Sequence, residues 1–147
     1  MSRKSKTPRQ YVNPRIQKEP RIASEPQTGD ALPFQWRTDY MDHGGPFNWE
    51  VLSVQEFCRK VVNPLHNIET MEWGAVLRMQ HAHTLTWSSI ASNAIARLEE
   101  KSGDLPPDAE LLSVGFSGRE RIIGIRDRRY FYLLWWDPFH QVSPSHR

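Results

Sequence analysis

The amino-acid sequence predicts an α+β domain in which a strand and two or three helices precede three antiparallel strands. Two observations predict this order: apolar residues recur at helical spacing in the middle of the chain, and they alternate or run together after residue 107. A third observation concerns residues 1–33, which contain five of the eleven prolines and few large apolar residues. Such a segment cannot bury enough surface to offset its ordering entropy. We therefore expect a disordered tail over residues 1–33 and a single domain over residues 34–147.

The domain is expected to open with a strand and a turn. Alternating residues over 34–40 predict the strand, and the D-H-G-G-P sequence at 42–46 is typical of a turn. Phe47 and Trp49 follow this turn, and we expect both rings to pack against the core.

The first helix is predicted from its cap and its apolar stripe. Ser53 and Glu56 have the spacing of a capping box, and apolar residues follow at intervals of three and four as far as Leu65. Pro64 is expected to end or kink the helix, because a proline disfavours helical backbone in the residue before it. Cys58 lies next to the stripe and is expected to be a small core residue rather than a nucleophile.

A second long helix is predicted over residues 86–101, with Trp87 at the start of its buried stripe and Gly103 as its C-terminal stop signal. Between the two helices, a short helix is expected around Trp73 and a loop over residues 80–84.

Three antiparallel strands are predicted near the C-terminus, over residues 112–117, 121–126 and 130–136. The segment 127–129 is expected to form the turn between the last two strands. The last strand is apolar on both faces, as expected of a central strand, and its two tryptophans, Trp135 and Trp136, are expected in the core.

Several classes of protein are excluded by composition. The longest apolar run, residues 130–136, is far shorter than the roughly 18–20 residues that cross a bilayer, so no membrane association is expected. The N-terminus lacks the features of a secretory signal. Cys58 is the single cysteine and permits neither a disulfide nor a thiolate zinc cluster, which favours a cytoplasmic location. His81 and His83 lack a third ligand at suitable spacing, so no metal site is expected. No dinucleotide or phosphate-loop motif is present, so no cofactor is expected.

The formal net charge of +2 hides an uneven distribution. Residues 1–33 carry seven basic and three acidic residues, a net charge of +4, and the rest of the chain carries a net charge of −2. The basic tail is either a solubilising segment or an electrostatic arm for nucleic acid or a protein partner. A second basic cluster, residues 119–129, holds five arginines against two acidic residues.

This second cluster is the main candidate for a functional site. Arg119 and Arg121 are expected on one face of a strand, because side chains alternate with a period of two, and Arg126 has the opposite parity. Such a patch beside tyrosine and tryptophan suits phosphate contact with base stacking, and Arg128 and Arg129 extend it. The alternative is an ordinary solvated strand edge, whose charges discourage edge-to-edge pairing. The residues alone leave both alternatives open.

From Arg121 to Pro144 the chain has the pattern R-I-x-G-x-R, a short turn, and F-x-L-L-W-W-D-P-x-H-x-V-x-P. This pattern resembles a group of small bacterial proteins related to the RelE/ParE toxin superfamily. The segment 34–36 and the pair Trp73-Gly74 fit the same group less specifically. The resemblance covers about residues 34–144 and implies helices packed on a small, mainly antiparallel sheet.

The resemblance also implies a function. Members of the superfamily act as ribosome-associated mRNA endonucleases or bind DNA gyrase, and are neutralised by an antitoxin, so RNA or the ribosome and an antitoxin protein are the implied partners. The RelE-like nucleases use no metal and transfer the RNA 2′-hydroxyl onto the adjacent phosphate, which requires a proton acceptor, cationic donors and an acid. The candidates to hold the phosphate are Arg119, Arg121 and Arg126. Tyr132 or His140 would move protons, and Asp137 would orient His140.

Two other hypotheses stand beside this one: a non-catalytic module that binds a protein or nucleic acid, and a gyrase inhibitor. In the structural alternative, Asp137 caps the end of a strand through backbone amides and His140 is a structural histidine. Dispersed arginines and an exposed aromatic patch would favour binding. Cleavage would require one open sheet face on which several of five side chains converge: Arg119, Arg121, Arg126, Tyr132 and His140.

Overall fold

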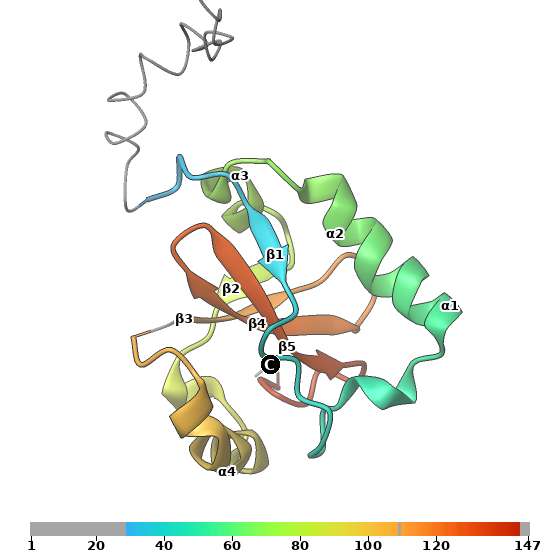
Figure 1. Cartoon of the computed structure of the whole chain (residues 1–147), viewed down its shortest axis with the longest axis vertical. Helices are drawn as coiled ribbons and strands as arrows, with labels where there is room; N and C mark the ends of the chain where they lie inside the picture. Colours follow the sequence, from blue (N-terminus) through green and yellow to red (C-terminus); the bar gives the residue numbers. More distant parts are fainter. Residues whose placement is uncertain (1–28, 109, 145–147) are drawn as a thin grey trace, which may run out of the picture.

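The computed structural model describes residues 29–108 and 110–144, which form an α+β fold around one five-stranded sheet (Figure 1). The strand order is β1-β5-β4-β3-β2. Neighbouring strands are antiparallel except β1, which pairs parallel to β5. No helix in the described part of the chain is long and apolar enough to cross a membrane. The strands are β1 (Gln35–Arg37), β2 (Ala82–Thr84), β3 (Glu110–Val114), β4 (Arg121–Asp127) and β5 (Tyr130–Asp137).

The first helical segment begins at the expected capping box: the Ser53 hydroxyl accepts a hydrogen bond from the Glu56 amide, and the Glu56 carboxylate accepts one from the Ser53 amide. Of the two effects expected of Pro64, to end or to kink the helix, the first does not occur, because the helical segment continues to Ile68; a π-helical turn interrupts the regular α-helix just before Pro64. Pro64 lies in the first turn of α2, where a helix does not need the missing N–H. Three consecutive pieces make up the segment: α1 (Val54–Phe57), the π-helical turn η3 (Cys58–Val62) and α2 (Asn63–Ile68).

The π-helical turn also changes which side chains face the core. A π turn holds more residues than the 3.6 of an α-helix, so the apolar stripe does not continue in phase across it. Val61 and Leu65 are buried, whereas Val54 is exposed. Cys58 is exposed as well, so the expectation of a core cysteine is wrong.

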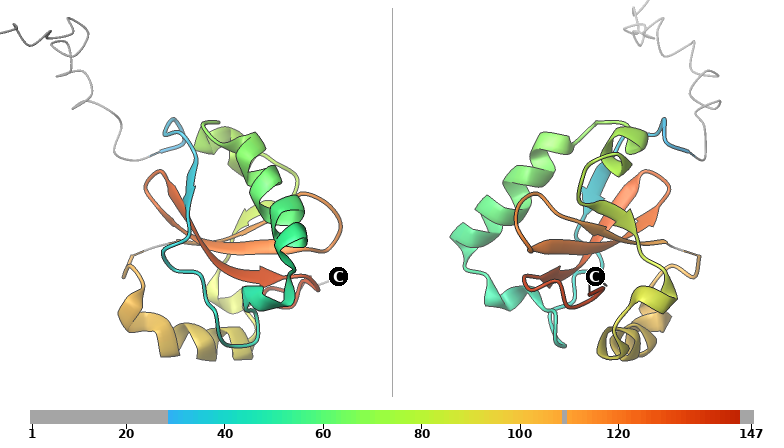
Figure 2. Two further views of the ribbon diagram at one scale, coloured as in Figure 1. Left: turned by 45° about the vertical axis from the view of Figure 1, so that its right-hand side comes forward. Right: turned by 180° about the vertical axis from the view of Figure 1, so that it is seen from behind.

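One face of the sheet packs against α1, α2 and the short helix α3 (Trp73–Leu77). Trp73 is fully buried there, and its indole N–H donates to the carbonyl oxygen of Arg129 at 2.8 Å. The other face packs against α4 (Ser92–Lys101) through Ala94 and Leu98. Figure 2 shows α2 and α4 on opposite sides of the sheet.

A β-bulge in β5 distributes its apolar residues between the two faces. The register between β4 and β5 shifts at Ile123/Gly124. As a result, the consecutive residues Leu134 and Trp135 both belong to the core beneath α4, and Trp136 belongs to the core beneath α2. Both tryptophans are buried, as expected from the sequence.

The helix predicted over residues 86–101 begins later than expected. Trp87–Ser89 form a 3-10 turn, Ile90 is extended, and α4 begins at Ser92. The Ala91 amide donates to the carbonyl oxygen of Val142 at 2.8 Å, and this contact with the C-terminal turn holds the chain out of the helix. Trp87 is consequently 65% exposed rather than buried. The loop expected over residues 80–84 contains the edge strand β2.

The ordered body extends further toward the N-terminus than the expected start at residue 34. Leu32 is buried in the core, and its carbonyl oxygen accepts a hydrogen bond from the Trp73 amide. Pro33 forms an isolated bridge with Glu72. The expected disorder of the tail concerns mainly residues 1–28, which lie outside the described residues.

Candidate functional site

Arg121 is the first residue of β4 and lies opposite Asp137, the last residue of β5. Its Nη1 donates to the carbonyl oxygens of Gly118 at 2.7 Å and Glu120 at 2.9 Å. Nη2 lies 3.4 Å from Nδ1 of His81. These contacts fasten the connection between β3 and β4, so the guanidinium has a structural task.

The Arg121 guanidinium is poorly placed to meet a large substrate. The residue is only 7% exposed, and burial lowers the pKa of the guanidinium, an effect that the charge of Asp137 opposes. Its Nε is buried without a hydrogen-bond partner among the described residues. The side chain also covers Gly115, where a β-carbon would collide with the guanidinium.

Asp137 caps the turn that follows β5. One carboxylate oxygen accepts the Gln141 amide and the other accepts the Val142 amide, both at 2.8 Å. Asp137 therefore caps the end of the strand through backbone amides, the structural alternative to orienting His140. His140 lies in the same turn, half-buried, with a positive φ of 58°.

Tyr132 lies away from these residues, in the middle of the sheet. It pairs with Ile125, four residues along β4 from Arg121, which at about 3.3 Å per residue corresponds to roughly 13 Å. The structure therefore brings Arg121 and Asp137 together, with His140 in the adjoining turn, but places Tyr132 elsewhere.

The arginines expected to bind nucleic acid are dispersed. Arg119 lies exposed in the turn before β4, so the expectation that it shares a strand face with Arg121 is wrong: β4 begins only at Arg121. Arg128 is at the tip of the β4–β5 hairpin with its side chain 71% exposed. Arg129 is half-buried in the same turn, and its carbonyl oxygen accepts hydrogen bonds from Gln35 and Trp73.

Arg126 is committed to the fold. Its guanidinium carbon lies 4.2 Å from the centre of the Trp73 ring, within cation–π range. Nε donates to the carbonyl oxygen of Arg128 and Nη2 to that of Gly29, both at 3.1 Å. Nη1 lies 3.8 Å from the carboxylate of Asp30. Arg126 thus fastens the start of the described chain to the sheet.

Beside the hairpin, three tyrosines form a surface group that the sequence reasoning did not single out as a unit. We call Tyr40, Tyr130 and Tyr132 the tyrosine cluster. The rings of Tyr40 and Tyr132 lie 4.7 Å apart, and those of Tyr130 and Tyr132 lie 6.0 Å apart. All three side chains are half-buried. The period of two in Tyr130–Tyr132 is a sequence signal for the pair, whereas Tyr40 joins it only through the fold.

An arginine completes this surface. Arg37 of β1 pairs in register with Tyr132, and its guanidinium carbon lies 5.6 Å from the centre of the Tyr130 ring. The hydrogen bonds between Arg37 and Asp39 raise the pKa of the arginine and lower that of the carboxylate. Asp39 therefore keeps the positively charged Arg37 guanidinium in place next to the tyrosine rings.

The Tyr132 phenol does not supply a base at neutral pH. Burial raises the pKa of Tyr132 above its ordinary value of 10.0, and the neighbouring Tyr40 raises it further. The hydroxyl stays protonated, so the cluster offers flat aromatic faces and neutral hydroxyl groups.

Among the described residues, no three histidine, cysteine, aspartate or glutamate side chains are placed to hold a metal ion. Comparisons with protein-family models, with curated proteins and with solved structures find no match for this chain.

Proposed function

We propose that this chain is an RNA-binding module that recognises single-stranded RNA through the tyrosine cluster and does not cleave it. The observation that carries the proposal is the grouping of three tyrosine rings with the Arg37 guanidinium on one sheet face. Unstacked bases of single-stranded RNA bind by stacking on aromatic rings and guanidinium planes, while the backbone is held by positive charge.

Positive charge is available close to the cluster. Tyr130 directly follows the hairpin turn that carries the exposed Arg128. The same hairpin holds Gly29 through Arg126, so the preceding residues 1–28 join the body there. Residues 1–28 contain seven basic and two acidic residues. A phosphate backbone that follows the hairpin therefore meets the exposed Arg128, at the hairpin where residues 1–28 join the body.

RNA cleavage needs several groups at one phosphate, and the candidate groups of this chain do not converge in that way. Arg121 is almost completely buried, Asp137 is occupied by backbone amides, and Tyr132 lies roughly 13 Å along the sheet by the strand rise. The RelE/ParE resemblance adds mRNA or the ribosome as the proposed target and an antitoxin as a proposed partner.

The test is binding of a fluorescent single-stranded RNA of mixed sequence, measured by polarisation. Loss of one stacked base costs about 1–3 kcal/mol, so Tyr132→Ala should weaken binding about 5- to 150-fold. Tyr132→Phe is the matched control, because it keeps the ring and should bind like the wild type. Equal affinity of the alanine variant and the wild type would refute the tyrosine cluster as the binding surface.

The absence of cleavage is tested on the same RNA in the presence of a chelator. The RNA should remain intact on a denaturing gel after it has bound. Cleavage by the wild type that is lost in Arg121→Ala would favour the metal-independent nuclease instead.

A further inference from the structure

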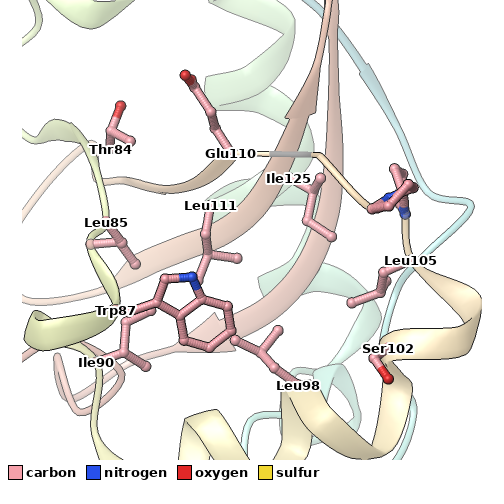
Figure 3. Close-up of a pocket in the computed structure, with 12 residues that line it drawn as sticks. Thr84, Leu85, Trp87, Ile90, Leu98, Ser102, Leu105, Glu110, Leu111 and Ile125 are labelled. Carbon is pink, nitrogen blue, oxygen red and sulfur yellow. The ribbon is translucent and has the colours of Figure 1, made fainter.

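An apolar pocket of about 500 Å³ lies between α4 and the sheet, and none of the three tyrosines of the cluster lines it. Figure 3 shows Trp87, Leu98, Leu105, Leu111 and Ile125 around the same space. Trp87 is one of the largest exposed apolar side chains of the described residues. An exposed tryptophan next to an apolar pocket is typical of a site where another segment or molecule docks, and is not typical of an ordinary solvent-exposed surface.

The rim of this pocket is acidic. Glu110 lines the pocket, and the exposed Asp104 and Asp108 belong to the connection that runs past it from α4 to β3. None of the three forms an ion pair within the described part of the chain. A segment that fits this pocket would place apolar side chains in the pocket and basic side chains beside its acidic rim.

The chain itself carries such a segment. Residues 1–28 hold the apolar side chains of Tyr11, Val12, Ile16 and Ile22 among seven basic and two acidic residues. Within this segment, residues 11–22 carry all four of these apolar side chains together with three basic residues and one acidic residue.

The segment also joins the body close to the pocket. Gly29 and Glu110 line one neighbouring cavity of about 320 Å³, and Glu110 lines the apolar pocket as well. Arg126, the register partner of Glu110, donates to the carbonyl oxygen of Gly29. An extended chain spans at most about 3.3–3.6 Å per residue, so the residues between Ile16 and Gly29 reach roughly 40 Å.

We propose that residues 11–22 of this chain dock into the pocket beneath α4, with an apolar side chain against Trp87 and basic side chains beside the acidic rim. A short tether gives the segment an effective concentration in the millimolar range, so even a weak contact is populated. Docking would place the basic segment against the body. This inference does not rest on RNA binding, because none of the three tyrosines lines the pocket, although both proposals involve the basic residues 1–28.

Limited proteolysis of the full chain by trypsin tests the proposal, with each cleavage site followed by mass spectrometry. A docked segment is cleaved only when it opens, so cleavage after Arg15 and Arg21 should be about 10-fold slower than in a free peptide of residues 1–28. Cleavage after Lys4 should match the peptide and serves as an internal control. Peptide-like rates at Arg15 and Arg21 would overturn the proposal.

Two variants locate the contact. Trp87→Ala removes a wall of the pocket and Glu110→Lys reverses the rim charge, and each should return Arg15 and Arg21 to the peptide rate. Val54→Ala, at an exposed apolar residue of α1 on the other face of the sheet, should keep the protection. If Trp87→Ala does not fold, as judged by circular dichroism, the surface substitution Glu110→Lys carries the test.

Two outcomes would place the segment elsewhere. Protection that persists in both pocket variants would overturn the assignment to this pocket. Protection that rises with protein concentration would assign the pocket to the segment of a second copy and overturn docking within one chain. Neither outcome alters the comparison of Tyr132→Ala with Tyr132→Phe, which is read from RNA affinity.

Discussion

The Arg97 guanidinium grips the Asp42 carboxylate through two hydrogen bonds, Nε to Oδ2 and Nη2 to Oδ1, each of 2.8 Å. Asp42 is fully buried, and it also accepts the Trp135 indole N–H at 2.9 Å and the Gly44 amide at 3.1 Å. Together with Trp135, the pair links the loop after β1, helix α4 and strand β5. Lys101 of α4 also lies 3.5 Å from the Asp42 carboxylate. The packing of α4 on the sheet therefore depends on a buried carboxylate that is held mainly by Arg97, a residue far from it in the chain.

Removal of Arg97 should be strongly destabilising, because it leaves the Asp42 carboxylate buried without its main partner. Breaking one side of a buried pair costs about 3–5 kcal/mol, so Arg97→Ala should lower the free energy of unfolding in urea by about that amount. Arg37→Ala breaks the exposed pair with Asp39 and is the matched control. It should cost less than about 1 kcal/mol. Similar losses in the two variants would contradict the structural role of the buried pair.

Stability should fall in acid through the same carboxylate. Burial alone would raise the pKa of Asp42, but hydrogen bonds from Arg97, Trp135 and Gly44 lower it from 3.8 to about 2. Below pH 4 the unfolded state binds more protons, so the stabilisation is complete above about pH 4 and is lost as the pH falls toward 2. The loss amounts to about 2 kcal/mol. The free energy of unfolding of the wild type and of Asp42→Asn, measured across this pH range, gives the size of this loss. Parallel pH profiles of the two proteins would exclude Asp42 as the cause of the acid destabilisation.

The close packing at the bulge of β5 should not tolerate an added methyl group. At Gly124 a β-carbon would overlap the Phe131 ring and lie 2.6 Å from the Tyr132 carbonyl oxygen. Gly124→Ala should destabilise the protein by about 1–3 kcal/mol, as overpacking does in other cores. At Gly103 a β-carbon meets nothing within 4 Å of the described structure, so Gly103→Ala should change stability by less than about 0.5 kcal/mol. Equal effects of the two substitutions in thermal unfolding would contradict this packing.

Alanine substitutions of two arginines in the β4–β5 hairpin should have different effects, one on stability and the other on RNA binding. Arg126 packs on Trp73 and holds Gly29, so Arg126→Ala should destabilise the fold by about 1–3 kcal/mol through lost packing and hydrogen bonds. Arg128 is largely exposed, so Arg128→Ala should leave the unfolding midpoint unchanged. The Arg128 variant should instead bind RNA more weakly and lower the salt dependence of binding by about one phosphate contact. Unchanged RNA affinity and salt dependence in Arg128→Ala would remove the hairpin tip from the proposed interface.

Much of the local structure was predictable from short-range patterns. The capping box at Ser53, the short helix at Trp73 and the three C-terminal strands depend on side-chain spacing, which the sequence displays directly. The burial of Trp135 and Trp136 followed from the apolar character of the strand. Asp137 also fits the strand-capping alternative, since a carboxylate next to a proline at a strand end readily accepts backbone amides.

The errors have long-range causes. The burial expected for Trp87 failed because Ala91 bonds to Val142, 51 positions further along, which no local pattern contains. Pro64 did not end the helical segment, because it lies just after the π-helical turn and in the first turn of α2, where its missing N–H is tolerated. Arg126 was predicted as a surface cation and is held by Trp73 and Gly29, which only the fold brings to it.

By itself, the sequence determined the α+β class, the element types near the C-terminus and the uneven distribution of charge, because each depends on composition or on neighbours within a few positions. The tertiary structure alone decided which charged groups are free. It divided the expected catalytic residues along the sheet, drew Arg121 and Arg126 into structural contacts, and placed Tyr40 beside Tyr132. Strand register, the bulge in β5 and the parallel pairing of β1 set these positions, and each is a relation between distant segments that only the packed chain establishes.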